Sequence, residues 1–499
     1  MPPLPALSDP EDDEYAASPS AAQQSDPLLW AFLTLMFLAP IPLGSNLPWA
    51  SHLLELGIFV LVALWTLRHI LRGQPFLRNV NRLSLVFGLF LTWATLPMVQ
   101  ILPLGAHSVL HADAVVELIR FTHPQATHFP VSLDVHATME AFFRNLAYLG
   151  ASWLVLVLIN TRDNLRLAVT ALFASGVFQG LYGFFSSLGG AHLLPLLPAW
   201  DPLEGGTVVG TYVNRNHLAG LLELTIPLGL AMAVTLARSN RSRRESEIPR
   251  WPQNLNQLLG RYGLFLVLSM FSTLVMLLTR SRGAALAFGC SLVVLWFLTF
   301  FKEYPSDRER RVLNRLLVFA LAGGILSAGV FLLVERFHQS AIAADMRAAV
   351  LPQTLEKVLH YPLLGTGAGT FGSTFPPYRT ETITKRVTHA HNDHLEFMAD
   401  YGVLGYLLLM LPVLVSWGIL LRRFLQRRDP LARGVLMGSL MGSFALALHG
   451  MVDFNLQIPA NALYFFVVLF LGLVSADIAT TRRSRRRHRL DGTDESDAT

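Results

Sequence analysis

The chain has 499 residues, of which 52% are hydrophobic and only 15% are charged, and its mean hydropathy is +0.44. A soluble globular protein carries about 25% charged residues, so the composition excludes an ordinary soluble domain and favours a polytopic membrane protein. The net charge of +5 reflects basic residues at the ends of apolar runs, not a nucleic-acid-binding surface. The single cysteine, Cys290, excludes both an intrachain disulfide and a cysteine-based metal site.

The two ends of the chain differ from the apolar region at 28–480 between them. Residues 1–27 are rich in Pro, Ser, Ala and acidic residues and lack the basic start of a signal peptide, so they predict a disordered cytoplasmic tail. Residues 481–499 form a second predicted cytoplasmic tail, first polybasic and then acidic. Its run "RRSRRRHR" at 482–489 suits contact with anionic lipid, and equally a simple stop-transfer flank.

Twelve apolar runs between the tails are long enough to be considered as membrane-spanning helices, each needing about 20 residues. The first is interrupted by Pro40 and Pro42, and the fourth begins with the polar pair Arg144-Asn145. The predicted spans are 28–44, 49–70, 83–101, 142–160, 165–187, 217–237, 262–279, 284–301, 315–334, 402–421, 434–451 and 460–479.

The distribution of basic residues predicts the orientation of these spans. Six segments on one side of the predicted membrane hold 28 of the 39 Lys and Arg residues. Basic residues are enriched in cytoplasmic loops, so both termini are predicted in the cytoplasm and the number of spans is even. The largest loop on the other side, 335–401, connects spans nine and ten and contains a predicted amphipathic helix at 346–359. The expected fold is therefore an all-α polytopic membrane protein of about twelve spans.

The stretch "HAHNDH" in this large loop places His389, His391, Asp393 and His394 at the spacing of a dinuclear zinc site in the metallo-β-lactamase fold. That fold needs further ligands from later strands. Here a membrane helix follows directly, so no metal site is expected. The alternative interpretation is a helix start, in which Asn392 or Asp393 caps the helix.

Three other polar clusters reach the same predicted side of the membrane. "NRNH" at 214–217 precedes the sixth span, "TRSRG" at 279–283 joins two spans by a tight turn, and "HGMVD" at 449–453 follows the eleventh. His449 and Asp453 are four residues apart and would share a face if helical, either as a functional pair or as an internal hydrogen bond. Snorkelling anchors and accidents of topology are the alternatives for the arginines.

The clusters together supply arginine, histidine and aspartate, without cysteine and without a dense group of carboxylates. Guanidinium groups bind phosphate in a bidentate manner, and a histidine can act as a general base near neutral pH. This chemistry suits a phosphorylated substrate in the membrane whose leaving group is stabilised by arginine.

The same residues resemble the O-antigen ligase family, which includes O-antigen polymerases and pilin-glycosylating enzymes. The similarity lies in "HNDHLEFMADYGVLG" at 391–405, in the run from Arg347 to Tyr378 with "PLLGTGAGTF", and in "SRGA" at 281–284. Arg215-Asn216-His217 resembles the upstream loop element of the family. The resemblance covers mainly residues 205–410.

The resemblance implies an inverting, metal-independent glycosyltransferase of the C-type membrane architecture, with no cofactor. Its donor would be a glycan on undecaprenyl diphosphate, and its acceptor a hydroxyl of a glycan or of lipid A-core, at the periplasmic face of the bacterial inner membrane. His391 is carried over as the base or catalytic imidazole, and Arg215 and Arg282 as the diphosphate clamp, with Arg280 as a third candidate. His389 is expected to be the most dispensable histidine. Neighbouring polar residues are expected to support the site: Asn214, His217, Asn392, His394, His449 and Asp453.

Two questions stay open at this level. The sequence does not separate a ligase from a polymerase, because it does not show the acceptor. A transporter or flippase is the alternative from another class, since twelve spans suit one and Glu223 in the sixth span is suited to line a pathway. The polar residues gather at one face and not near the midplane, which favours the enzyme.

Overall fold

The computed structural model describes residues 26–73, 78–103, 130–189, 208–242, 261–300 and 341–478, and all the regular elements in these ranges are helices. A single isolated bridge joins Pro103 and Pro130. Within the described ranges, seven helices are long and apolar enough to cross a membrane. They are α2 (Pro48–Arg72), α3 (Arg78–Ile101), α5 (Val135–Leu158), α6 (Arg162–Gly189), α7 (Arg215–Ser242), α14 (Asp393–Gln426) and α15 (Pro430–His449).

Four shorter apolar helices account for most of the remaining predicted spans. They are α1 (Pro27–Leu38), α9 (Arg261–Leu278), α10 (Arg282–Phe300) and α16 (Pro459–Ser475). Eleven of the twelve predicted spans therefore fall on helices, and the ninth, at 315–334, lies outside the described residues. The prediction of an all-α polytopic membrane protein is confirmed, while the count of twelve stays a prediction. The predicted tails lie outside the described residues except for Asp26 and Pro27.

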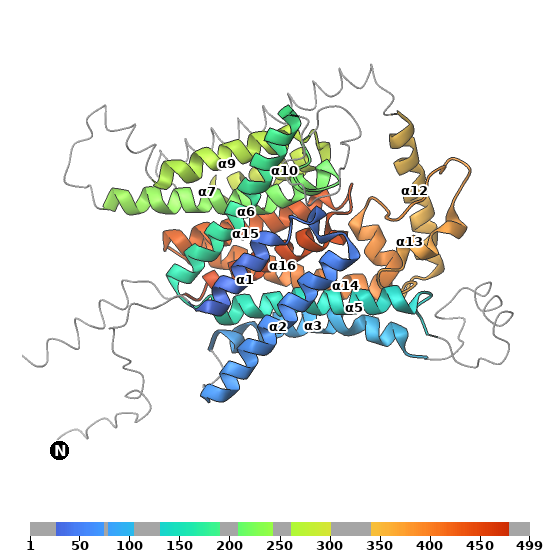
Figure 1. Ribbon diagram of the computed structural model, residues 1–499, viewed down its shortest axis with the longest axis horizontal. Coiled ribbons are helices and arrows are strands. Elements are labelled where there is room, and N and C mark those ends of the chain that lie inside the picture. The colour runs from blue at the N-terminus through green and yellow to red at the C-terminus, as the bar shows by residue number, and fades with distance from the viewer. Residues whose placement is uncertain are drawn as a thin grey trace, which may run out of the picture.

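Helix α16 forms the centre of the bundle, because all 17 of its residues are buried. It is apolar on every side, which is the pattern of a helix surrounded by others. The Phe466 ring stacks with Trp93 of α3 and Tyr148 of α5 at centroid distances of 5.8 and 5.6 Å. In Figure 1 the long helices run side by side with α16 among them.

Helices α7 and α15 pack closely because α15 presents small residues to α7. A Cβ atom at Gly438 would lie 2.9 Å from the Pro227 carbonyl oxygen, and one at Gly442 would lie 3.0 Å from the Leu224 Cα. Spacing small residues four apart lets two membrane helices approach to backbone contact. This packing brings the start of α7 next to the end of α15, where two of the predicted polar clusters lie.

Helix α14 is broken at Gly402, which adopts φ 69° and ψ 176°. A short first part at 393–401 is thereby separated from the long part predicted as a span from 402. The backbone of the preceding loop packs into the break, since the Val403 N–H donates to the Pro362 carbonyl at 2.8 Å. Gln100 of α3 holds the same loop by donating to the Leu364 carbonyl at 2.6 Å.

The predicted amphipathic helix at 346–359 is present within α12 (Ala341–His360). Together with the short helix α13 (Phe371–Thr374), it lies at one end of the bundle (Figure 1). Lys357 fastens α12 to the first part of α14 through a buried ion pair with Asp400, whose N–O distance is 3.7 Å. The Lys357 ammonium also lies 4.7 Å from the centre of the Phe371 ring. Burial lowers the pKa of Lys357, against the opposing effect of Asp400 and Glu396.

Candidate active site

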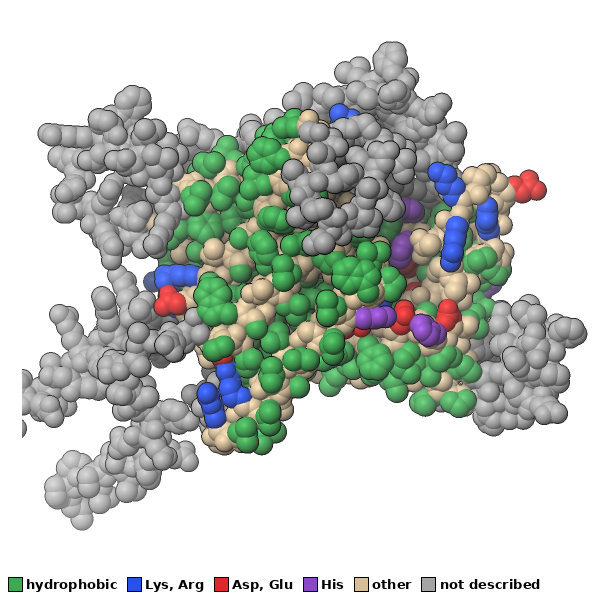
Figure 2. All heavy atoms as spheres, viewed as in Figure 1, with side chains coloured by type: hydrophobic (Ala, Val, Ile, Leu, Met, Phe, Trp, Pro, Cys, Tyr) green, Lys and Arg blue, Asp and Glu red, His purple; other side chains and the backbone are tan. Residues whose placement is uncertain are grey.

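The structure brings all four predicted polar clusters together at the end of the bundle near α12. The Asn216 side-chain amide donates to the Asp453 carboxylate, and the Ser281 hydroxyl lies 3.4 Å from His449 Nε2. The Asp393 N–H donates to the Gly450 carbonyl at 2.7 Å. Histidine side chains are visible at the surface on the side of the bundle that faces α12 (Figure 2). Segments far apart in the sequence therefore form one polar site.

His391 occupies a tight turn directly before α14. Its φ is 53°, in the left-handed region that non-glycine residues rarely adopt. Asn392 is the N-cap of α14, as predicted, because its Oδ1 accepts from the Leu395 N–H at 3.0 Å. The same side chain donates to the Met451 carbonyl at 2.8 Å. The turn that carries His391 is thus fixed both to α14 and to the segment after α15.

Asp393 joins these two segments more firmly. Its N–H is shared between the carbonyls of Gly450 and Asp453, and its Oδ2 accepts from the Leu456 N–H at 3.0 Å. Asp393 is completely buried. It connects the start of α14 to the turn after α15 and does not point to a metal position. Among the described residues, no group of three or more His, Cys, Asp or Glu side chains is arranged to hold a metal ion.

Phe454 lies at the centre of the site, between three histidine rings. The His389 ring stacks on it at 4.4 Å with an interplanar angle of 13°. The rings of His391 and His217 meet it edge to face at 4.9 and 4.8 Å. Phe454 was not among the predicted site residues, because one more apolar residue in an apolar chain carries no signal of its own.

Asp453 is a buried anion that orients the start of α7. Its Oδ1 lies 3.7 Å from His217 Nε2 and accepts from the Phe454 N–H at 2.8 Å. Burial alone would raise the pKa of Asp453, but the imidazoles of His217 and His449 outweigh it and hold that pKa well below its usual range. Asn214 completes this arrangement, since its Oδ1 accepts from the Asn216 N–H at 2.9 Å.

His449 and Asp453, which the spacing predicted as a pair or as an internal hydrogen bond, are joined through the main chain, since the Asp453 N–H donates to the His449 carbonyl at 3.1 Å, while their side chains have other partners. Helix α15 ends at His449, so Asp453 lies beyond the helix and pairs with His217. His449 Nδ1 instead lies 3.2 Å from Glu223 Oε2 of α7. On its other side, His449 Nε2 faces the hydroxyl of Ser281, which also accepts from the Ala284 N–H at the start of α10.

The arginines predicted to bind diphosphate lie at helix starts around this network. Arg215 is the first residue of α7 and is partly exposed. Arg282 is the first residue of α10, and Arg280 precedes it with a φ of 56°; both are exposed. The Ser281 contact with His449 fixes the turn between these two arginines. Helix starts carry a partial positive charge that favours anions.

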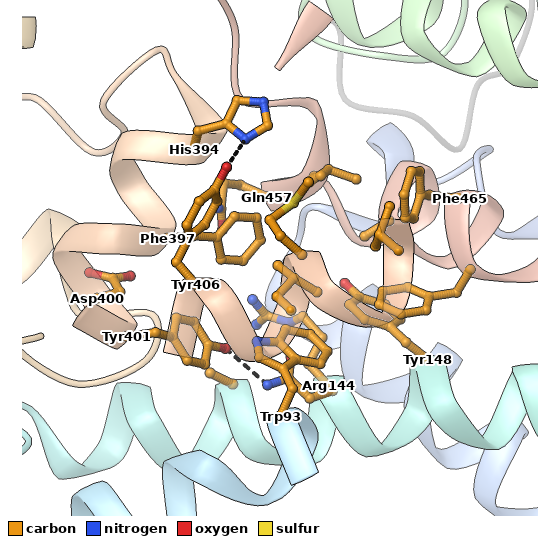
Figure 3. Close-up of a pocket in the computed structure, with 18 of the residues that line it drawn as sticks. Trp93, Arg144, Tyr148, His394, Phe397, Asp400, Tyr401, Tyr406, Gln457 and Phe465 are labelled. Carbon is orange, nitrogen blue, oxygen red and sulfur yellow. Dashed lines mark hydrogen bonds between the residues drawn. The ribbon is translucent and has the colours of Figure 1, made fainter. Parts of the chain in front are cut away.

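His394 makes its contacts away from Phe454, although it follows His391 by three residues. Its Nδ1 lies 2.9 Å from the Tyr406 hydroxyl and its Nε2 lies 2.9 Å from the Ala447 carbonyl oxygen. A carbonyl only accepts, so Nε2 carries the hydrogen and Nδ1 accepts from Tyr406. Figure 3 shows His394 beside a largely apolar cavity that Trp93 and Tyr148 also line. These contacts of His394 do not involve Phe454, so its supporting role beside His391 stays a prediction.

The fold and the site define a multi-pass helical membrane protein with histidine and arginine side chains gathered at one end of its bundle. A family model described as O-antigen ligase matches residues 265–410, a region that holds Arg280, Arg282 and His391. Residues 265–410 are thus similar to the O-antigen ligase family, in agreement with the resemblance that the sequence motifs predicted. The match supports a glycosyltransferase-type activity in a membrane. No curated protein sequence matches the chain.

Proposed function

We propose that this protein transfers a glycan from undecaprenyl diphosphate to an acceptor hydroxyl, at the periplasmic face of the bacterial inner membrane. The observation that carries the proposal is the convergence of His391 with the arginine-bearing starts of α7 and α10. Asn216 and Asp453 link α7 to the turn beside His391, and Ser281 and His449 link α10 to the same turn. The site thus combines a candidate base with cations suited to a diphosphate.

In the proposed reaction, the acceptor oxygen attacks the anomeric carbon from the face opposite the diphosphate. The bond between that carbon and the diphosphate oxygen breaks, and the hydroxyl proton passes to His391. The electron pair remains on the diphosphate, whose charge is neutralised by Arg215 and Arg282, with Arg280 as a third cation. A single displacement of this kind inverts the anomeric configuration, and it needs no metal because guanidinium groups stabilise the leaving group.

The acceptor distinguishes two forms of this activity. A ligase would use lipid A-core, whereas a polymerase would use the end of another glycan chain, and both share the donor and the chemistry at His391. Glu223, the residue suited to the transporter alternative, is completely buried and engages His449, so it belongs to the network that positions the arginine turn.

The test uses the full-length protein in liposomes with lipid-linked glycan and either acceptor. We expect His391→Ala to lower transfer by at least about 100-fold, in the range seen when a general base is removed, with normal expression and membrane insertion. His136→Ala is the matched control, because this histidine is 85% exposed on α5. Near-normal transfer by the His391→Ala protein would remove this residue from the mechanism, and movement of the glycan without a new glycosidic bond would favour a transporter.

A further inference from the structure

Glu396 is a buried carboxylate in the first turn of α14, with only 2% of the residue exposed. Both of its oxygens engage the two residues directly before His391. Its Oε1 lies 2.8 Å from His389 Nδ1, and its Oε2 accepts from the Ala390 N–H at 2.7 Å. A buried carboxylate is costly unless it is paired, and here the pairing partners are the residues that lead into the candidate base.

The backbone at His391 needs such support. A non-glycine residue in the left-handed region is strained and persists only where its surroundings fix it. Glu396 fixes the chain before His391, and the cap and main-chain contacts of Asn392 and Asp393 fix it afterwards. Without the Glu396 contacts, only one side of the strained residue would be held.

The same carboxylate also fixes the ring against which His391 rests. It holds the His389 imidazole, which stacks flat on Phe454. The His391 ring meets that same Phe454 ring edge to face, with a centroid distance of 4.9 Å and an interplanar angle of 75°. Glu396 therefore supports both the main chain before His391 and the ring that the His391 imidazole contacts.

Charge strengthens this arrangement. Burial opposes protonation of His389, but the Glu396 carboxylate outweighs it, with smaller effects from Asp400 and Asp453, so the pKa of His389 is raised. The other titratable groups that interact with this pair are His217 across Phe454, Lys357 on α12 and the buried Asp393 in the same turn of α14. His389 therefore stays cationic to a higher pH than an ordinary histidine, and its charge compensates that of the buried carboxylate.

We propose that Glu396 and His389 form a positioning unit that holds His391 in its reactive geometry. The inference rests on the proposed function and assigns a role to the histidine that the sequence ranked as most dispensable. A positioning unit acts on turnover: a misplaced base slows the chemical step, while the arginines at the starts of α7 and α10 continue to bind the donor.

The test measures kcat and the donor KM for Glu396→Ala, Glu396→Gln and His389→Asn in liposomes. We expect Glu396→Ala to lower kcat by about 10- to 100-fold, the cost of a catalytic group displaced by about 1 Å, with the donor KM within about twofold. Glu396→Gln keeps an oxygen for the Ala390 N–H, and His389→Asn keeps a donor in place of Nδ1, so both should recover part of kcat. Glu381→Gln is the matched control, because Glu381 is exposed in the same loop.

The pH profile separates positioning from a purely structural role. With its pKa raised by the Glu396 carboxylate, His389 loses its proton at a higher pH than an ordinary histidine, so the alkaline limb of kcat follows this loss. Removing the carboxylate charge in Glu396→Gln lowers the His389 pKa, and the alkaline limb should move to lower pH. An unchanged profile together with wild-type kcat would overturn the proposal, as would a raised KM at normal kcat.

Two further comparisons keep the result unambiguous. Should Glu396→Ala fail to fold, as judged by thermal unfolding in detergent, Glu396→Gln and His389→Asn carry the test, and wild-type kcat in both overturns the proposal. His391→Ala is measured in parallel. Inactivity of His391→Ala with full activity of the Glu396 variants would refute only the positioning unit, whereas transfer by His391→Ala would refute the proposed mechanism itself.

Discussion

The turn that carries Arg280 and Arg282 depends on one small residue. A Cβ atom at Gly283 would lie 2.8 Å from His449 Cδ2 and 2.7 Å from Val452 Cγ2. These atoms belong to a packed network, because His449 also engages Glu223 and Ser281. The arginine turn therefore keeps its position only while His449 and the start of α10 remain in direct contact.

We expect Gly283→Ala to raise the donor KM several-fold, because the added methyl group must displace His449 or the turn with its arginines. Overpacking of this kind costs typically about 1–3 kcal/mol. Gly289→Ala is the matched control in the same helix, since a Cβ atom there meets nothing within 4 Å. Initial-rate kinetics with varied donor give the comparison; equal KM values for the two variants would show that the turn tolerates displacement.

At the scale of residues, the sequence pointed to the charged groups and to several polar residues beside them, such as Asn392 and Asp453, but not to every residue that holds the site. His391, Arg215 and Arg282 were predicted because they lie in polar clusters beside apolar runs and match motifs of the O-antigen ligase family. Phe454 and Glu396 were not, since one is a common apolar residue and the other looks like a favourable first-turn acid of a helix. Their importance depends on contacts across segments that spacing along one segment does not reveal.

Among the elements, α14 shows how a helix break positions the site. Gly402 combines a positive φ with a close approach: a Cβ atom there would lie 2.1 Å from the Leu363 carbonyl oxygen. The first part of α14 carries Asn392, Asp393 and Glu396, so its direction relative to the long part decides where His391 lies. The sequence predicted a helix start at Asn392 or Asp393 and a span from 402, but not the break at Gly402 that separates them.

Gly402→Ala should destabilise the protein by several kcal/mol, because it adds strain at a left-handed position and a clash with backbone. The matched control is Gly418→Ala in the same helix, where a Cβ atom has open space; this change should be neutral or stabilising by up to about 1 kcal/mol. Thermal unfolding in detergent measures both. A melting temperature for Gly402→Ala equal to that of Gly418→Ala would mean that the loop at 362–366 does not depend on the break.

For the whole molecule, composition and charge asymmetry sufficed to predict an all-helical polytopic protein, because burial in a membrane requires long apolar helices. They did not predict that α16 is surrounded on all sides, since an apolar helix facing lipid and one facing other helices have the same composition. Nor did they predict how the polar ends meet. That depends on the packing of α7 against α15, which brings Asp453 to His217 and Glu223 to His449.

The same asymmetry of basic residues leaves few of them at the end of the bundle that holds the site. Each of these few residues therefore matters more for attracting an anionic donor. Lys385 and Arg386 are exposed in the loop that leads to His391, and basic side chains are visible on this part of the surface (Figure 2). Exposed charges attract a ligand over about 10 Å at 0.1 M salt and over longer distances at lower salt.

We expect Lys385→Gln with Arg386→Gln to raise the donor KM about two- to fivefold at low ionic strength, with kcat unchanged. The increase should fade as salt is added. Arg422→Gln with Arg428→Gln removes the same charge from exposed positions near the other end of α14 and should leave KM unchanged. Equal KM changes in the two double variants would mean that net charge, and not its position near the site, governs donor capture.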